Sequence, residues 1–411
     1  MIDNKRIDLM GGGGCPRTTN HKSEILQSVS SSDDPCLSNG NNYQLSSGNT
    51  SNPSSATYNL KVENSQNGVL GRPGGGKNRQ SNIELCRIAA ILMVMLLHSD
   101  FQVFGWPKSL DDTSVGLILL ESFCIIAVNV FILITGFFST KPKVSSIINL
   151  IYICLFVGIF KVLFDLYMGN PISWKRWFFF TRSNWFIPTY LGLVLFSPIL
   201  NAFCEKASRK DLSMCIVILL GYETYMGFFP AIPQIPVGFE HGCSVLSFVL
   251  LYLIGRYICL YGLPNYISRF STLIYIGCSV LLAIIEFVAL KFNLGEYSMY
   301  LYDYTNPLII FASICFFMSF SKYDIGSNNI INHLSKSVLS VLLIHASGTA
   351  MRYIDPHYEY MYNQFSGITL FLLWGLTVFV LFVFSVCADQ IRLWSYKSIS
   401  KYLFKHDKMT Y

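Results

Sequence analysis

Long apolar stretches alternate with short polar ones from about residue 83 onward. Each stretch approaches the 20 or so residues that an α-helix needs to cross the hydrocarbon core of a bilayer. The pattern predicts an all-α fold, a polytopic transmembrane helical bundle of about ten spans, of which the eighth and ninth are short. The predicted spans are Ile83–Phe104, Val115–Ser139, Ile147–Met168, Trp185–Phe203, Leu212–Phe229, Ser244–Tyr261, Leu273–Phe292, Pro307–Phe320, Val338–Tyr353 and Ile368–Ala388.

Residues 1–80 have a different composition, rich in Gly, Ser and Asn, with runs such as GGGGC, SSSDD and RPGGGK. Such a segment buries too little apolar surface to offset its ordering entropy, which predicts a disordered N-terminal tail. It has no apolar region near its start and so is not a signal peptide. An over-extended gene start is the alternative, because Ser81-Asn82-Ile83-Glu84 would make a natural beginning. Residues 81–390 then form the membrane domain and residues 391–411 a basic C-terminal tail.

Composition and charge agree with a protein whose main partner is the lipid bilayer. Hydrophobic residues make up 52% of the chain and charged residues only 13%, about half the charged share of soluble domains. The net charge of +6 follows from topology rather than from nucleic-acid binding. The twelve cysteines are scattered singly, which argues against a disulfide framework and against a metal site.

Basic residues in the predicted loops indicate the orientation, with both termini in the cytoplasm of a multi-pass protein. The side predicted to be cytoplasmic holds Lys77, Arg79, Lys141, Lys143, Lys206, Arg209, Lys210, Arg269, Lys322, Lys336, Arg392, Lys397, Lys401, Lys405 and Lys408. The opposite side holds Lys108, Lys175, Arg176, Arg182, Lys291 and Arg352.

Two ionisable residues lie inside the first predicted span, Arg87 near the cytoplasmic surface and His98 deeper in the membrane. Eleven helical steps rotate by about 1100°, close to three full turns, so both side chains point the same way, and the rise between them is ~16 Å. A histidine with a pKa near neutrality can take a proton from an acceptor hydroxyl, and an arginine can hold a phosphate-bearing donor. The alternative is that Arg87 extends to the surface and pairs with Glu84 while His98 only packs.

Other polar and aromatic residues within the spans have a structural and a functional interpretation. Asn129 and Gly136 share a helix face, which favours close helix approach and an interhelical hydrogen bond. Trp185 fits an interfacial anchor and His345 a packed core histidine. Together with Glu84, the residues Asn129, Trp185 and His345 are the candidates for lining a substrate cavity.

The segments IELCRIAAILMVMLLH, VNVFILITGFFS, NWFIPTYLGLVLFSPILN and VLLIH occur in an order that resembles the acyltransferase-3 family of integral membrane O-acyltransferases. The resemblance covers about residues 81–390, and its most specific element is an Arg and a His separated by ten residues. It implies that His98 is catalytic and that Arg87 is a donor-side residue. The chain departs from the pattern at Asn129, where many members have Asp, and at Thr135, where members often have Ser.

The resemblance implies an O-acetyltransferase of the cell (inner or plasma) membrane that uses acetyl-CoA as a co-substrate and no tightly bound cofactor. The acceptor would be an envelope glycan or a lipid-linked sugar. Whether His98 acts as a general base or carries the acetyl group stays open. The competing class is a non-enzymatic transporter or flippase of a glycan or lipid precursor. Such a protein would show repeated halves with broken spans in both, and no internal repeat is evident in the sequence.

Overall fold

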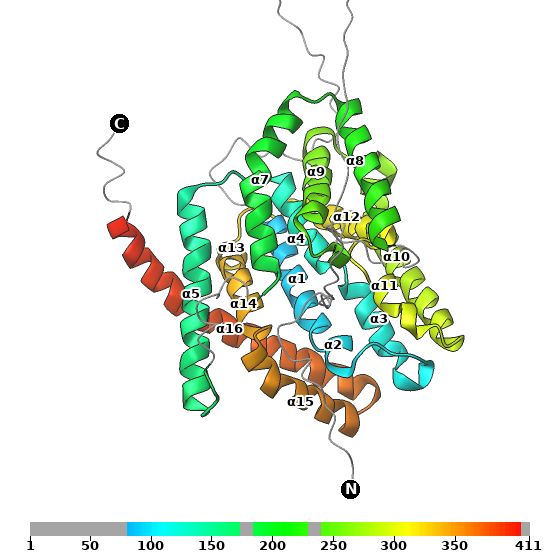
Figure 1. Ribbon diagram of the computed structural model, residues 1–411, viewed down its shortest axis with the longest axis vertical. Coiled ribbons are helices and arrows are strands. Elements are labelled where there is room, and N and C mark those ends of the chain that lie inside the picture. Colours follow the sequence, from blue (N-terminus) through cyan, green and yellow to red (C-terminus); the bar gives the residue numbers. More distant parts are fainter. Residues whose placement is uncertain (1–79, 173–183, 229–239, 404–411) are drawn as a thin grey trace, which may run out of the picture. The chain divides into compact units, whose positions relative to one another are not determined.

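The computed structural model describes residues 80–172, 184–228 and 240–403, which hold helices and no strand (Figure 1). The predicted tail, residues 1–80, lies outside the described residues except for Gln80. The helices are α1 (Ser81–Leu97), α2 (Phe101–Phe104), α3 (Val115–Cys124), α4 (Ala127–Phe137), α5 (Val144–Tyr167), α7 (Phe186–Lys206), α8 (Arg209–Glu223), α9 (Val245–Tyr261), α10 (Asn265–Lys291), α11 (Ser298–Leu301), α12 (Pro307–Ser321), α13 (Asn329–Leu334), α14 (Val338–His345), α15 (Gly348–Gln364) and α16 (Gly367–Leu403). Short turns of helix are η1 (Leu110–Asp112), η3 (Thr224–Phe228), η4 (Glu240–Gly242), η5 (Gly295–Tyr297) and η6 (Ser335–Ser337).

Apolar helices of spanning length confirm the predicted all-α membrane fold. Within the described residues, 7 helices are long and apolar enough to cross a membrane, or up to 8 if one bent pair forms a single span. Two of the predicted spans, at α9 and α12, form shorter apolar helices. The predicted number of about ten is therefore approximate, although every predicted span is helical over most of its length.

The ninth predicted span, Val338–Tyr353, was expected to be one continuous helix, and this is wrong. Helix α14 ends at His345, and α15 leaves at an angle of 80°. Ser347 causes the break, because its hydroxyl accepts the backbone N–H of Ala350 at 3.2 Å and so caps α15. The same hydroxyl donates to the carbonyl of Ile344 at 2.9 Å and closes the end of α14.

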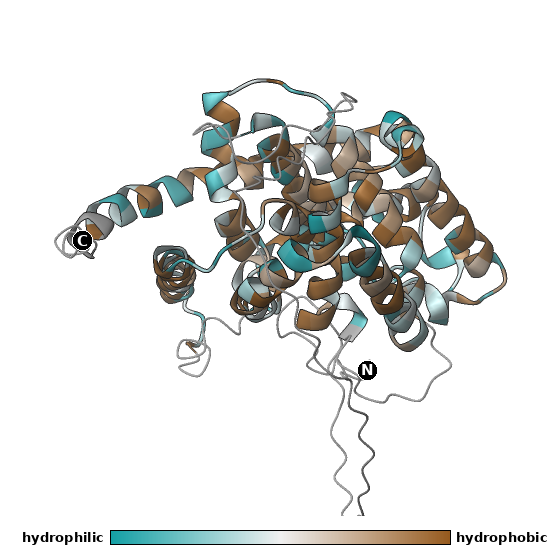
Figure 2. Cartoon of the chain, turned by 90° about the horizontal axis from the view of Figure 1, so that it is seen from above, coloured by the Kyte–Doolittle hydropathy of each residue, from teal (hydrophilic) through white to brown (hydrophobic). Residues whose placement is uncertain are grey.

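Helix α1 lies at the centre of the bundle, packed against α3, α4, α12, α14 and α16 (Figure 1). Its buried side chains include Ile83, Ala90 and Ile91. Figure 2 shows that apolar residues make up most of the outer helices as well, and Leu163 of α5 and Leu273 of α10 are exposed, as expected for surfaces that contact lipid. Helix α5 is much less enclosed, with 22% of its most apolar window buried. Because α1 is central, the residues directly after its C-terminal end lie deep within the bundle.

A glycine contact brings α4 and α9 close together. A Cβ atom added to Gly136 would lie 2.2 Å from the carbonyl oxygen of Tyr252, and one added to Gly255 would lie 2.3 Å from that of Leu133. Both distances are too short for any other residue without a backbone shift. The close helix approach predicted at Gly136 is therefore confirmed.

Helix α16 continues through the predicted domain boundary after residue 390 to Leu403. Arg392 lies on the continuation and is buried, with its Nε 2.5 Å from Oδ1 of Asp389 and its second terminal nitrogen 2.9 Å from Oδ2. This bidentate pair joins the two sides of the boundary within one helix.

Candidate active site

His98 lies at the point where α1 ends, with its own backbone N–H still bonded to the carbonyl of Val94 at 3.1 Å. The next residue, Ser99, is fully buried and fixes this end of the helix. Its hydroxyl donates to the carbonyl of Leu96 at 2.7 Å and accepts the indole N–H of Trp374 at 2.6 Å. Because Trp374 belongs to α16, these bonds hold the backbone at His98 against a second helix.

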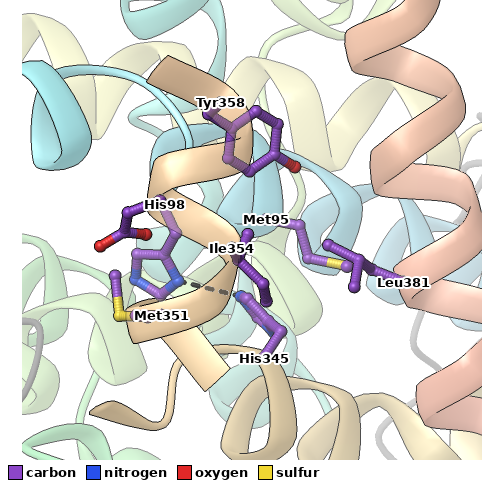
Figure 3. Close-up of a pocket in the computed structure, with 8 residues that line it drawn as sticks. Met95, His98, His345, Met351, Ile354, Tyr358 and Leu381 are labelled. Atoms are coloured by element: carbon purple, nitrogen blue, oxygen red, sulfur yellow. Dashed lines mark hydrogen bonds between the residues drawn. The ribbon is translucent and has the colours of Figure 1, made fainter. Parts of the chain in front are cut away.

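His345 meets His98 from the end of α14. The distance from Nδ1 of His98 to Nε2 of His345 is 2.9 Å, and the ring centroids are 5.0 Å apart (Figure 3). On its other side, Nδ1 of His345 lies 2.6 Å from the carbonyl oxygen of Val341. The structure therefore brings together two of the candidate residues predicted from the sequence.

The hydrogen bonds assign the tautomers of the neutral pair. The Val341 carbonyl only accepts, so Nδ1 of His345 carries a proton and donates it, and Nε2 of His345 accepts. Nδ1 of His98 must then be the donor in the bond between the two rings. This leaves Nε2 of His98 with an unshared electron pair, as a base or a nucleophile requires.

A small pocket of about 10 Å³ lies beside the two histidines. It is lined by residues from α1, α14, α15 and α16, as Figure 3 shows for the labelled side chains. The lining residues are Met95, His98, His345, Met351, Ile354, Asp355, Tyr358 and Leu381. Methionine, isoleucine and leucine side chains thus line part of the pocket, and Asp355 and Tyr358 add polar groups to it.

Helix α15 contributes lining residues that the sequence interpretation missed, among them Asp355 and Tyr358. Oδ1 of Asp355 is buried and has no hydrogen-bond partner among the described residues. A straight ninth span would have placed both residues beyond the membrane end of that helix. The Ser347-Gly348 step was the local signal for the bend, since serine is a preferred helix cap.

Arg87 belongs to a different part of α1 and pairs with Glu84. Its Nη1 lies 2.8 Å from Oε1 of Glu84, and its guanidinium carbon is 5.7 Å from the ring centre of Phe138. The side chain is 29% exposed. The pairing given above as the alternative is thus present. Neither Arg87 nor Glu84 lines the pocket beside His98.

Asn129 and Trp185 come together at the loop before α12, and neither lines the pocket beside His98. The side-chain amide of Asn129 donates to the carbonyl of Tyr304 at 3.2 Å, and the rings of Trp185 and Tyr304 are 6.1 Å apart. The interhelical bond expected of Asn129 is therefore a bond from helix to loop.

Asp303 in the same loop forms an ion pair with His241 of η4. Nδ1 of His241 lies 2.6 Å from Oδ2 of Asp303, and this hydrogen bond raises the pKa of His241 above its usual value. Asp303 also accepts bonds from the backbone N–H and hydroxyl of Thr305 at 2.8 and 2.7 Å. His241 adopts the left-handed backbone conformation, with φ of 57°.

The described residues contain no group of three or more His, Cys, Asp or Glu side chains placed to hold a metal ion. Free thiols are found at Cys86, Cys124, Cys154, Cys204, Cys215, Cys259, Cys278, Cys315 and Cys387. Cys243 is disulfide-bonded.

A match to a known protein family covers most of the chain. A family model described as an acyltransferase domain, the acyltransferase-3 type, matches residues 80–389. The matched range includes both histidines, the pocket beside them and Arg87. No curated protein and no solved structure shows significant similarity to the chain.

Proposed function

Because the chain belongs to the acyltransferase-3 family, we propose that it is an integral membrane O-acetyltransferase. It moves an acetyl group from cytoplasmic acetyl-CoA to a hydroxyl of a cell-envelope glycan or a lipid-linked sugar. The proposal places it in the cell (inner or plasma) membrane with both termini in the cytoplasm.

One observation carries the chemical part of the proposal, the bond chain from Val341 through His345 to His98. It orients the ring of His98 and leaves its Nε2 unprotonated, in a pocket between four helices. General bases of this kind contribute about 10²–10⁴ to a rate.

In the first route His98 is a general base. Its Nε2 takes the proton from the acceptor hydroxyl while the oxygen attacks the thioester carbonyl of acetyl-CoA. The tetrahedral intermediate collapses by breaking the carbon–sulfur bond, and the leaving thiolate takes the proton back from Nε2. The products are the O-acetyl ester and CoA. His98 returns to its starting state, and its Nδ1 stays bonded to His345 throughout.

In the second route His98 is the acyl carrier. Its Nε2 attacks the thioester, CoA leaves, and the acetylated imidazole then transfers its acetyl group to the acceptor oxygen. The proton of the acceptor hydroxyl ends on the CoA thiolate or on solvent. Both routes need the same unprotonated Nε2.

Arg87 is proposed to hold the donor. Its guanidinium is partly exposed and keeps N–H donors beyond the one used by Glu84, so it can bind a phosphate of CoA. Along one helix the rise to His98 is ~16 Å. The pantetheine arm, which separates the phosphates of CoA from its thioester, would cover this distance.

The test uses the purified protein in lipid vesicles, with radiolabelled acetyl-CoA and an envelope-glycan extract. We expect label on the glycan with the wild-type protein and its loss with His98→Ala. The matched control is His357→Ala, because His357 is on α15 but does not line the pocket. Transfer that survives His98→Ala would refute the catalytic assignment. Label that stays on His98 without an acceptor selects the carrier route over the base route.

A further inference from the structure

A second and larger cavity adjoins the pocket beside His98. It lies between α5, α14, α15 and α16 and has a volume of about 160 Å³. His345, Ile354 and Leu381 line both cavities, so the two meet beside His345. An acetyl group needs only a small part of this volume.

Most of the wall of the larger cavity is apolar. Helix α5 contributes Phe160 and Phe164, and α14 contributes Ile344. On the far side the wall includes Phe384 of α16. A hydrocarbon chain fits these surroundings, whereas a sugar would leave its hydroxyl groups without partners.

The cavity is open to the surface of the bundle. Two of its lining residues, Tyr353 and Phe384, are 40% and 54% exposed. Next to them, Leu163 on α5 and Val380 on α16 expose their apolar side chains. A closed cavity would limit the length of a bound chain. An open one lets a long chain continue into the bilayer.

Basic groups lie close to this cavity. Lys161 is one of the lining residues. Arg352 donates to the side-chain oxygen of Asn170 at 3.0 Å, and Asn170 in turn bonds to the hydroxyl of Tyr353 at 3.2 Å. Arg352 is exposed and forms no ion pair with any described residue. The carboxylate of Asp165 lies here too and accepts bonds from Asn170 and Thr349 at 3.0 Å. The two cations outnumber it, so an amphiphile held here would carry a negative head group.

We infer that the cavity between α5 and α16 binds the hydrocarbon chain of a membrane amphiphile with a phosphate head group, and that this amphiphile carries the acceptor hydroxyl. A prenyl-phosphate-linked sugar has this chemistry. The inference rests on the proposed function and selects the lipid-linked form of the acceptor. Because the bilayer is as apolar as the cavity, burial of the chain adds little to the binding free energy. The cavity instead orients the amphiphile. Its head group is held beside the pocket of His98.

Photolabelling tests the inference without requiring turnover. The probe is geranylgeranyl phosphate that carries a diazirine on its chain, applied to the full-length protein in phospholipid vesicles. We expect peptides of α5 and α16 to be labelled, and unlabelled geranylgeranyl phosphate to compete. The variant Ala350→Phe fills the cavity from α15 and should reduce the labelling at least fivefold. Val157→Phe fills it from α5 and serves if the first variant does not fold.

The control variant Ala289→Phe places the same side chain on α10, away from both cavities, and should leave the labelling unchanged. Competition by lauroyl-CoA would mean that the cavity holds a donor acyl chain and would overturn the inference. Uniform labelling of all lipid-facing helices, unaffected by Ala350→Phe, would identify ordinary bilayer lipid and overturn it too. Acetyl transfer without labelling refutes this inference alone, and labelling without transfer refutes the proposed function alone.

Discussion

Nδ1 of His98 and Nε2 of His345 lie 2.9 Å apart and join the ends of two helices that are distant in the sequence. The contact depends on two helix ends. α1 stops at His98, and α14 stops at His345 because Ser347 caps the helix that follows. Either helix, continued straight, would carry its histidine on a helix wall instead of at an open end.

The first prediction concerns His345 as a positioning residue. His345→Leu removes the acceptor for Nδ1 of His98, so the proton of His98 is no longer confined to Nδ1. We expect kcat to fall by about 10²-fold, within the range for losing a general base, while KM for acetyl-CoA changes little. Steady-state kinetics at saturating acceptor measure both constants.

His345→Gln is the conservative variant, because its amide oxygen can accept the bond from His98. It should recover part of the lost kcat, which a purely structural role for His345 would not require. A rise in KM for acetyl-CoA at unchanged kcat would contradict the positioning role. His357→Leu serves as the control outside the pocket.

The second prediction concerns the contact between Arg87 and the donor. Arg87→Ala should weaken CoA binding by about 10-fold or more, as expected when a charge-assisted hydrogen bond to phosphate is lost. Isothermal titration with CoA measures the effect. The variant should not change the slower reaction with S-acetyl-N-acetylcysteamine, a thioester without phosphates. Equal losses with both donors would show that Arg87 supports the fold rather than the donor.

The sequence predicted the helices and the close approach at Gly136, and it included His98 and His345 among the candidate site residues. The helices and the approach at Gly136 depend on apolar and small residues that recur at regular positions within one helix. The bend before α15 was not predicted, because the spans were predicted from the hydrophobicity of long segments, and one capping serine changes that hydrophobicity very little. The grouping of Asn129 and Trp185 around Tyr304 was also missed, since contacts of a loop with distant helices follow no sequence period.

The third prediction tests the glycine contact between α4 and α9. Gly136→Ala places a Cβ atom 2.2 Å from the backbone oxygen of Tyr252, so the helices must separate. We expect a destabilisation of about 1–3 kcal/mol, measured as a lower thermal unfolding midpoint in detergent. Gly158→Ala on α5 is the matched control, because its added Cβ meets no atom within 4 Å. It should be neutral or stabilise by up to about 1 kcal/mol, since alanine favours a helix.

The fourth prediction concerns the pH dependence of the pair between His241 and Asp303. The hydrogen bond from His241 to Asp303 raises the pKa of His241 above its usual value of 6.5. The pair therefore contributes its full stability below pH ~6.5 and loses it as the pH rises through the folded-state pKa. His241→Asn removes the charge and tolerates the left-handed backbone at this position.

Thermal unfolding of the wild type and of His241→Asn between pH 5.5 and 9 measures this effect. The unfolding midpoint of the wild type should exceed that of the variant most at the acidic end. The difference between the two midpoints should become smaller as the pH increases. The difference in stability should not exceed about 1 kcal/mol, because His241 is partly exposed and solvent screens the pair. The control is His357→Asn, because His357 has no carboxylate partner among the described residues. The difference in stability between this variant and the wild type should not depend on pH. A difference for His241→Asn that widens with increasing pH would mean that the neutral form of His241 is the one the fold prefers.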